Sequence, residues 1–433
     1  MTGPPPVLVE KALGLMPELE ALEPLRALLI AVSRADEGAL WSSSGPYLTL
    51  GKRGVQPDEL RRRMPQAFHR IAEHLQVLYR AYVDALESQQ QGDAAGAVAA
   101  LLRAGRLEER VFRFQQAQAW YAVALRVAQA LNDRRPEVEA LRALGYVCLA
   151  LGTPAVGAGH FQRSLALAEA EFDQAGATAA CQGLGEAVLA QGQWGGAQAW
   201  FSRGLRLAEA AGDESRAGRL ECELGALARR QGDLAGAGDY LGRARERFES
   251  AGIAEEMARV LNEQGLLDAQ LGREGAASAA YREALAWSQR AGAGGGGPGL
   301  ELSIRLNLAE LDLEAGRLLE AESELRRAEQ VAISEGTMLR LVEVYTLMGR
   351  LRGAQEDETG FVFFEQAIEL AKALQHSLAT QAQVYHAYGL FRSRLRQQDE
   401  ARAYLERARE IFDSLGEAVE RERVEAELRA LSA

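Results

Sequence analysis

The stretch QWGGAQAWFSRGLRLAEAAGDESRAGRLECELGALARRQGD, residues 193–233, decides the fold because its pattern recurs about once every 40 positions. A Leu-Gly pair precedes it at Leu184–Gly185, and a second pair lies inside it at Leu224–Gly225. Between the two pairs, Ala197 and Phe201 are four residues apart, so they share one face of a helix. This recurrence predicts a chain built from repeated helical units.

The same skeleton continues on both sides of that stretch. Each unit has a shorter helical pattern that holds the Leu-Gly pair and a longer one with an A-x3-F/Y/L motif. Small residues let the helices approach closely, and the aromatic or leucine side chain fills the space beside them. One such hairpin cannot bury its own apolar face, so the units must stack. The Leu-Gly position is occupied by Gly105, Gly145, Gly185, Gly225 and Gly265, then, after a four-residue slip, by Ala309, Gly349 and Gly389.

This pattern resembles the tetratricopeptide repeat (TPR), in which L-G-x2-Y is followed by A-x3-F and a small residue three positions later. Two good matches are Leu144, Gly145, Gly157, Phe161 and Ser164, then Leu184, Gly185, Ala197, Phe201 and Gly204. The usual early Trp and closing Pro are missing, and the period is 40 instead of 34. Units of this length with an AGD turn (211–213) resemble the longer TPR subfamily of kinesin-light-chain-like proteins and of bacterial regulators' sensor regions. The resemblance implies an all-α, right-handed superhelical α-solenoid of about eight repeats.

The repeat divides the chain into three predicted regions. Residues 1–93 do not carry the repeat and are predicted to form a helical N-terminal cap, in which no convincing helix-turn-helix was found. The solenoid covers 94–416, and 417–433 is predicted as a C-terminal capping helix. Within the solenoid, the glycine-rich segment 292–299 is predicted as a flexible loop, because glycine disfavours helix. It is either a tolerated surface insertion or a hinge.

Composition excludes several classes of protein. Hydrophobic residues make up 48% and aromatic residues only 6% of the 433, as a helical solenoid requires. No apolar run is long enough to predict a signal peptide or a membrane span. The net charge of −12 argues against direct nucleic-acid binding. The prevalence of arginine over lysine suggests a GC-rich bacterial genome.

The three cysteines fall on the shorter helices of successive units, where a small apolar side chain is usually in the core. They are predicted to be buried structural residues, as expected in a reducing, cytoplasmic setting. The cysteines are Cys148, Cys181 and Cys222.

One concentration of basic residues lies in the N-terminal region. It is either the solvated start of a helix, which Asp58 and Glu59 favour, or a docking patch for an acidic partner. The residues are Lys52, Arg53, Arg61, Arg62 and Arg63.

No pattern in the chain predicts catalysis. The carboxylates follow helix-surface spacing and are placed to pair with arginines, as in Glu322 and Arg326. No nucleophile is accompanied by a base and an orienting group, and no phosphate loop or metal-ligand spacing is present. The chain is therefore predicted to be non-enzymatic, without a cofactor or metal.

By resemblance, the shorter helices line the concave face of the solenoid and present three positions around each Leu-Gly glycine to a groove. The densest polar set is Arg219, Arg229, Arg259 and Asn262. Such side chains either hold a peptide through charge-assisted hydrogen bonds or are ordinary polar lining. The predicted partner-binding residues are Arg142, Tyr146, Gln182, Glu186, Arg219, Arg229, Arg259, Asn262 and Glu310.

These expectations lead to two functional hypotheses. The first is an adaptor or scaffold that binds a peptide or protein in the concave groove. The alternative is a peptide or ligand sensor whose solenoid changes shape on binding. The shorter helices contain no lysine, so the clamp of chaperone-adaptor TPRs is not reproduced. Homo-oligomerisation is left open.

Overall fold

The computed structural model describes residues 84, 88, 91, 93–110, 114–130, 134–291, 297–335, 338–373, 378–415 and 418–431. The chain divides into two compact units, Met1–Leu220 and Glu221–Ala433, here called the N-terminal and C-terminal units. Every regular element within the described residues is an α-helix. The predicted all-α fold is confirmed.

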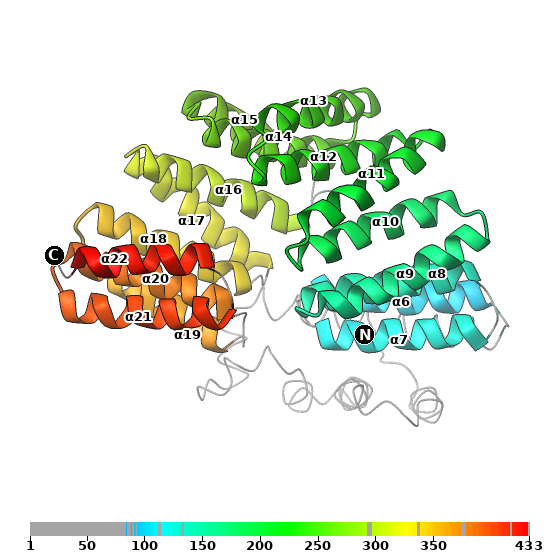
Figure 1. Cartoon of the computed structure of the whole chain (residues 1–433), viewed down its shortest axis with the longest axis horizontal. Coiled ribbons are helices and arrows are strands. Elements are labelled where there is room, and N and C mark those ends of the chain that lie inside the picture. The colour runs from blue at the N-terminus through cyan, green and yellow to red at the C-terminus, as the bar shows by residue number, and fades with distance from the viewer. Residues whose placement is uncertain are drawn as a thin grey trace, which may run out of the picture. The chain divides into compact units, whose positions relative to one another are not determined.

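The helices form consecutive antiparallel pairs within each unit (Figure 1). The even-numbered, first helix of each pair carries the Leu-Gly position, and the odd-numbered, second helix carries the A-x3-F motif. In the N-terminal unit the helices are α6 (Ala94–Arg110), α7 (Phe114–Ala130), α8 (Arg134–Ala150), α9 (Pro154–Ala170), α10 (Gln174–Leu189), α11 (Trp194–Ala210) and the first part of α12 (Glu214–Arg230). In the C-terminal unit the rest of α12 is followed by α13 (Leu234–Ala251), α14 (Ala254–Gln270), α15 (Glu274–Ala291), α16 (Gly297–Glu314), α17 (Leu318–Glu335), α18 (Met338–Ala354), α19 (Gly360–Ala373), α20 (Leu378–Arg394), α21 (Gln398–Leu415) and α22 (Ala418–Leu431).

The Leu-Gly glycine is the contact point of each hairpin. A Cβ atom added at Gly145 would lie 2.6 Å from the ring of Phe161, and one added at Gly185 would lie 2.3 Å from the ring of Phe201. Both phenylalanines are fully buried. The missing side chain thus lets the aromatic ring of the second helix lie directly against the backbone of the first, as predicted.

The predicted AGD turn is also confirmed. Gly212 has a φ of 67°, a left-handed conformation that glycine adopts without a Cβ clash. Asp213 then caps α12, because its Oδ1 accepts a hydrogen bond of 3.0 Å from the backbone N–H of Arg216. This pair of residues ends one helix and starts the next within three positions.

Two details of the sequence prediction are wrong. The two helices of a pair differ by at most one residue, as in α10 with 16 residues and α11 with 17. The exception is the pair in which the second helix, α19 with 14 residues, is shorter than the first, α18 with 17. Antiparallel helices that pack along their full length must span the same distance. The glycine-rich loop is also shorter than predicted, because α16 already begins at Gly297. Pro298 falls in its first turn, where a helix tolerates proline.

Several predicted features lie outside the described residues. They are most of the N-terminal cap region, the basic patch of Lys52, Arg53, Arg61, Arg62 and Arg63, and residues 292–296 of the proposed hinge. The division into three regions stays a prediction. At the other end, α22 packs against α21.

The first helices form a layer of their own in each unit. In the N-terminal unit α6 contacts α8 and α8 contacts α10, and in the C-terminal unit α14, α16, α18 and α20 contact one another in succession. Successive second helices of the described parts make no comparable contact. Each unit therefore curves with its first helices on the concave side. We call the surface that the side chains of these helices present to that concave side the inner face.

Phe172 occupies the turn position where the next repeat has Gly212. Its φ of 56° is in the left-handed region, and its side chain is 91% exposed. We expect Phe172→Gly to raise the free energy of unfolding by about 1 kcal/mol, because glycine removes the strain and no packing is lost. Urea denaturation of the full chain checks this. The reverse change, Gly212→Phe, is the matched control and is expected to destabilise; a loss of stability in Phe172→Gly would contradict the expectation.

Candidate functional site

The predicted residues of the N-terminal unit lie on its first helices. Arg142 and Tyr146 are half-buried on α8, and Gln182 and Glu186 are half-buried on α10. The ring of Tyr146 meets Phe161 edge-on with centroids 5.0 Å apart. Gln182 Nε2 donates a hydrogen bond of 3.0 Å to Glu186 Oε1. Because α8 and α10 are in contact, these side chains belong to one surface.

Arg219 is exposed on the part of α12 that belongs to the N-terminal unit. The other three members of its predicted polar set, Arg229, Arg259 and Asn262, belong to the C-terminal unit. Arg229 lies on α12, whereas Arg259 and Asn262 lie on α14, and each of the three contacts a different residue.

In the C-terminal unit, a series of polar contacts joins successive first helices. Arg229 Nη2 on α12 lies 3.2 Å from Glu263 Oε2 on α14. Asn307 Nδ2 on α16 donates a hydrogen bond of 2.9 Å to Asn262 Oδ1 on α14. We call these two contacts, together with a third described next, the polar ladder.

The third contact of the polar ladder joins α16 to α18. Arg350 Nη1 donates a hydrogen bond of 2.5 Å to Glu310 Oε1, and both side chains are partly exposed. The predicted residue Glu310 is therefore already held by an arginine of the next repeat. Its partner could have been found from the sequence, since Glu310 and Arg350 each follow a Leu-Gly position directly and are one 40-residue period apart.

Arg259 is engaged as well, though more weakly. Its Nη2 lies 3.4 Å from Glu255 Oε1 and its Nε lies 3.4 Å from Glu256 Oε2, while the side chain is 44% exposed. Three of the residues predicted to bind a ligand thus already make contacts within the protein: Arg229, Arg259 and Asn262. A ligand at this place must compete with glutamates of the protein itself.

Sequence reasoning missed the glutamates that surround these arginines. Burial raises the pKa of the Glu223 carboxyl, and the negative charge of Glu263 raises that pKa further, while Arg259 lowers it. Glu223 and Glu263 each stand two residues before a Leu-Gly glycine. That shared register was the available signal, because equivalent positions of adjoining repeats face each other.

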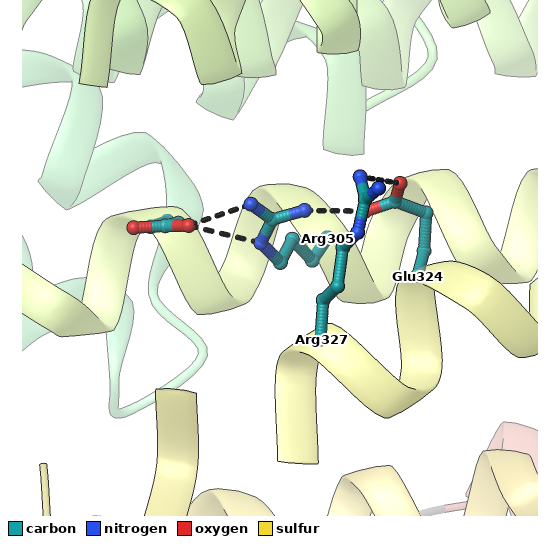
Figure 2. A network of polar contacts seen from close by, with 4 residues as sticks. Arg305, Glu324 and Arg327 are labelled. Atoms are coloured by element: carbon teal, nitrogen blue, oxygen red, sulfur yellow. Dashed lines mark hydrogen bonds and ion pairs between the residues drawn. The ribbon is translucent and has the colours of Figure 1, made fainter. Parts of the chain in front are cut away.

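A second network missed by the sequence lies between α16 and α17 (Figure 2). The Arg305 side chain is only 7% exposed and donates from Nε and Nη2 to Glu301 Oε1 over 3.0 and 2.7 Å. Its Nη1 donates to Glu324 Oε2 over 2.6 Å, and Arg327 donates to the other Glu324 oxygen over 3.2 Å. This network connects the two helices of one pair, so we assign it to stability.

The cysteines are buried as predicted, and all three are free thiols. Burial raises the pKa of Cys181 to about 11, so the thiol is protonated at neutral pH. Burial likewise raises the pKa of Cys222. These positions serve the core of the first-helix layer.

Among the described residues, no group of three or more His, Cys, Asp or Glu side chains is arranged to hold a metal ion. His386, on α20, contacts a single carboxylate, that of Glu427 on α22, at 2.5 Å. None of the helices searched in the described part combines the length and apolar character needed to cross a membrane.

Comparison with known proteins shows the fold. No protein-family model matches the chain, and no curated protein matches its sequence. A Rap protein in complex with Competence and Sporulation Factor is similar in structure, with 14% identity, a TM-score of 0.55, and coverage of 80% of this chain and 99% of that one. The apo form of the quorum sensor NprR from B. thuringiensis gives 15% identity, a TM-score of 0.51, and coverage of 76% and 99%.

A tetratricopeptide repeat protein from Parabacteroides merdae is also similar, with 15% identity, a TM-score of 0.45, and coverage of 68% and 99%. The two matches above 0.5 establish the architecture together with the helix pairs. The chain has the fold of a TPR-like α-solenoid.

Proposed function

We propose that the protein is a non-enzymatic interaction protein that binds a peptide or protein partner on the inner face. The observation that carries the proposal is the recurrence of half-buried polar and aromatic side chains at matching positions of successive first helices. These residues include Tyr146, Gln182, Glu186, Arg229 and Glu310. Within either unit, an extended peptide laid across the first helices would meet a hydrogen-bonding side chain at each repeat.

The structural neighbours support a ligand of this kind. One of them is a Rap protein complexed with Competence and Sporulation Factor, and the other is a quorum sensor. The net charge of −12 supports a partner other than nucleic acid. Three buried free thiols are compatible with a reducing compartment, and we place the protein in the cytoplasm.

The polar ladder favours sensing as a second candidate function. Its contacts join successive first helices through Arg229, Asn262 and Glu310, the same residues that a ligand would address. A ligand that replaced these internal partners would loosen or re-space the helices in the C-terminal unit. It would shift the protein between two conformations by its difference in affinity for them.

Site-specific photo-crosslinking in the cells that make the protein tests the proposal. A photoreactive residue is placed at Gln182 or Glu186 on the inner face, or at Gln162 or Arg206, which are exposed on second helices. We expect the inner positions to yield a discrete cross-linked species, identified by mass spectrometry, and the outer positions to yield none. Cross-links from the outer positions alone would place the partner elsewhere and contradict the proposal.

The same partner then separates the two candidate functions. Small-angle scattering is measured on the full chain with and without a saturating amount of the identified partner or its cross-linked segment. An unchanged internal distance distribution of the protein indicates an adaptor. A change that the polar-ladder variant Arg350→Gln reproduces without the partner indicates a sensor.

A further inference from the structure

Arg142 differs from the inner-face arginines of the C-terminal unit. Arg229 and Arg350 are each paired with a glutamate of an adjoining first helix. Arg142 is half-buried on α8, and no hydrogen bond or ion pair connects its guanidinium to any residue that the structure describes. It is thus a charged donor group on the inner face of the N-terminal unit, with no partner among the described residues.

The carboxylates that could have neutralised Arg142 from its own helix are engaged elsewhere. Glu139, almost one turn earlier on α8, lies 3.5 Å from Arg106 of α6. Glu137 accepts a hydrogen bond of 2.8 Å from Gln129 and lies 3.9 Å from Arg163. The sequence supplies acids on α8, and the fold directs both of them away from Arg142.

The surroundings of Arg142 offer complementary groups for a peptide. Tyr146 is one turn further along the same stripe of α8. On the contacting helix α10, Gln182 stands at the same register as Arg142, one 40-residue period later. Because Gln182 Nε2 is used by Glu186, its amide oxygen is the group left to accept from a backbone N–H. A guanidinium fork and an amide acceptor therefore share one surface.

A half-buried guanidinium loses part of its hydration, and a neutralising charge-assisted hydrogen bond offsets that loss. The planar fork fits a carboxylate with two parallel hydrogen bonds. We propose that Arg142 binds a carboxylate of the peptide ligand, from the chain terminus or from an Asp or Glu side chain, with Gln182 accepting from its backbone. This inference rests on the proposed function and locates its anchoring contact in the N-terminal unit.

Two libraries of N-acetylated random pentapeptides test the inference, one with a free C-terminal carboxylate and one with a C-terminal amide. Each is passed over the immobilised full chain, and the dissociation constants of the recovered peptides are measured for the native protein, Arg142→Gln and Arg142→Lys. Arg126→Gln is the matched control, because Arg126 is exposed on the second helix α7. Circular dichroism verifies that each variant is folded. If Arg142→Gln does not fold, the dissociation constants of Arg142→Lys test the role of Arg142.

We expect Arg142→Gln to weaken binding by about tenfold or more, Arg142→Lys by less, and Arg126→Gln not at all. Recovery from the acid library alone identifies the chain terminus as the source. Recovery of Asp- or Glu-containing peptides from both identifies a side chain. Peptides that bind the native protein and both Arg142 variants equally overturn the role of Arg142 while leaving the proposed function standing. If the native protein retains no peptide from either library, peptide binding itself fails.

Discussion

Replacing Phe201 by alanine is expected to lower the free energy of unfolding by about 3–5 kcal/mol. The side chain is fully buried, and its ring fills the space that Gly185 leaves open on the facing helix. Removing the ring creates a cavity at the contact point of α10 and α11, which the glycine cannot fill. In a solenoid the effect is concentrated in the altered pair and its neighbours, so hydrogen exchange should show it there first.

Urea denaturation and peptide-resolved hydrogen exchange of the full chain check this expectation. Phe172→Ala is the matched control, because Phe172 is the same residue type and is 91% exposed; its effect should stay within about 0.5 kcal/mol. A loss below about 1 kcal/mol in Phe201→Ala would mean that the glycine–aromatic contact does not hold the hairpin together.

The second large effect is expected at Arg305. Changing it to methionine should destabilise the α16–α17 pair by about 3 kcal/mol, because Glu301 and Glu324 would lose the cation that neutralises them in a mostly buried site. Arg327 retains one contact with Glu324, which limits the loss. Hydrogen exchange of α16 and α17, together with the urea midpoint, measures it.

Two comparisons give this prediction its controls. Arg326→Met removes an exposed arginine from the same helix α17, where the pair with Glu322 should contribute at most about 1 kcal/mol. The triple variant Glu301→Gln, Arg305→Met, Glu324→Gln removes the charges together and should recover much of the stability. If the triple variant is as unstable as Arg305→Met alone, packing and not charge explains the loss.

The helix pairs could be predicted from the sequence because their determinants are local. Gly185 and Phe201 are 16 residues apart in the chain, and the turn between them permits only a hairpin. The left-handed turn at Gly212 and the cap at Asp213 likewise depend on neighbours a few residues away. These short-range residue patterns therefore specify the hairpin and its turn without information from the rest of the chain.

The candidate site was predictable only in part. The register around each Leu-Gly glycine placed Arg142, Arg229 and Glu310 correctly on first helices. It did not show which of them already has a partner. Arg229 is paired with Glu263, and Glu310 is paired with Arg350, whereas Arg142 has no partner in the part of the chain that the structure describes. For this reason the proposed anchoring contact lies in the N-terminal unit.

The sequence by itself thus determined the repeated helical hairpins, their turns and the residues that form their core. Only the tertiary structure decided the nearly equal lengths of most paired helices, the start of α16 at Gly297 and the partners of the inner-face charges. The physical reason is the distance over which each kind of contact is made. The packing of a glycine against a ring is settled within one hairpin, whereas a long arginine side chain can meet several carboxylates of adjoining helices, and their relative placement selects among them.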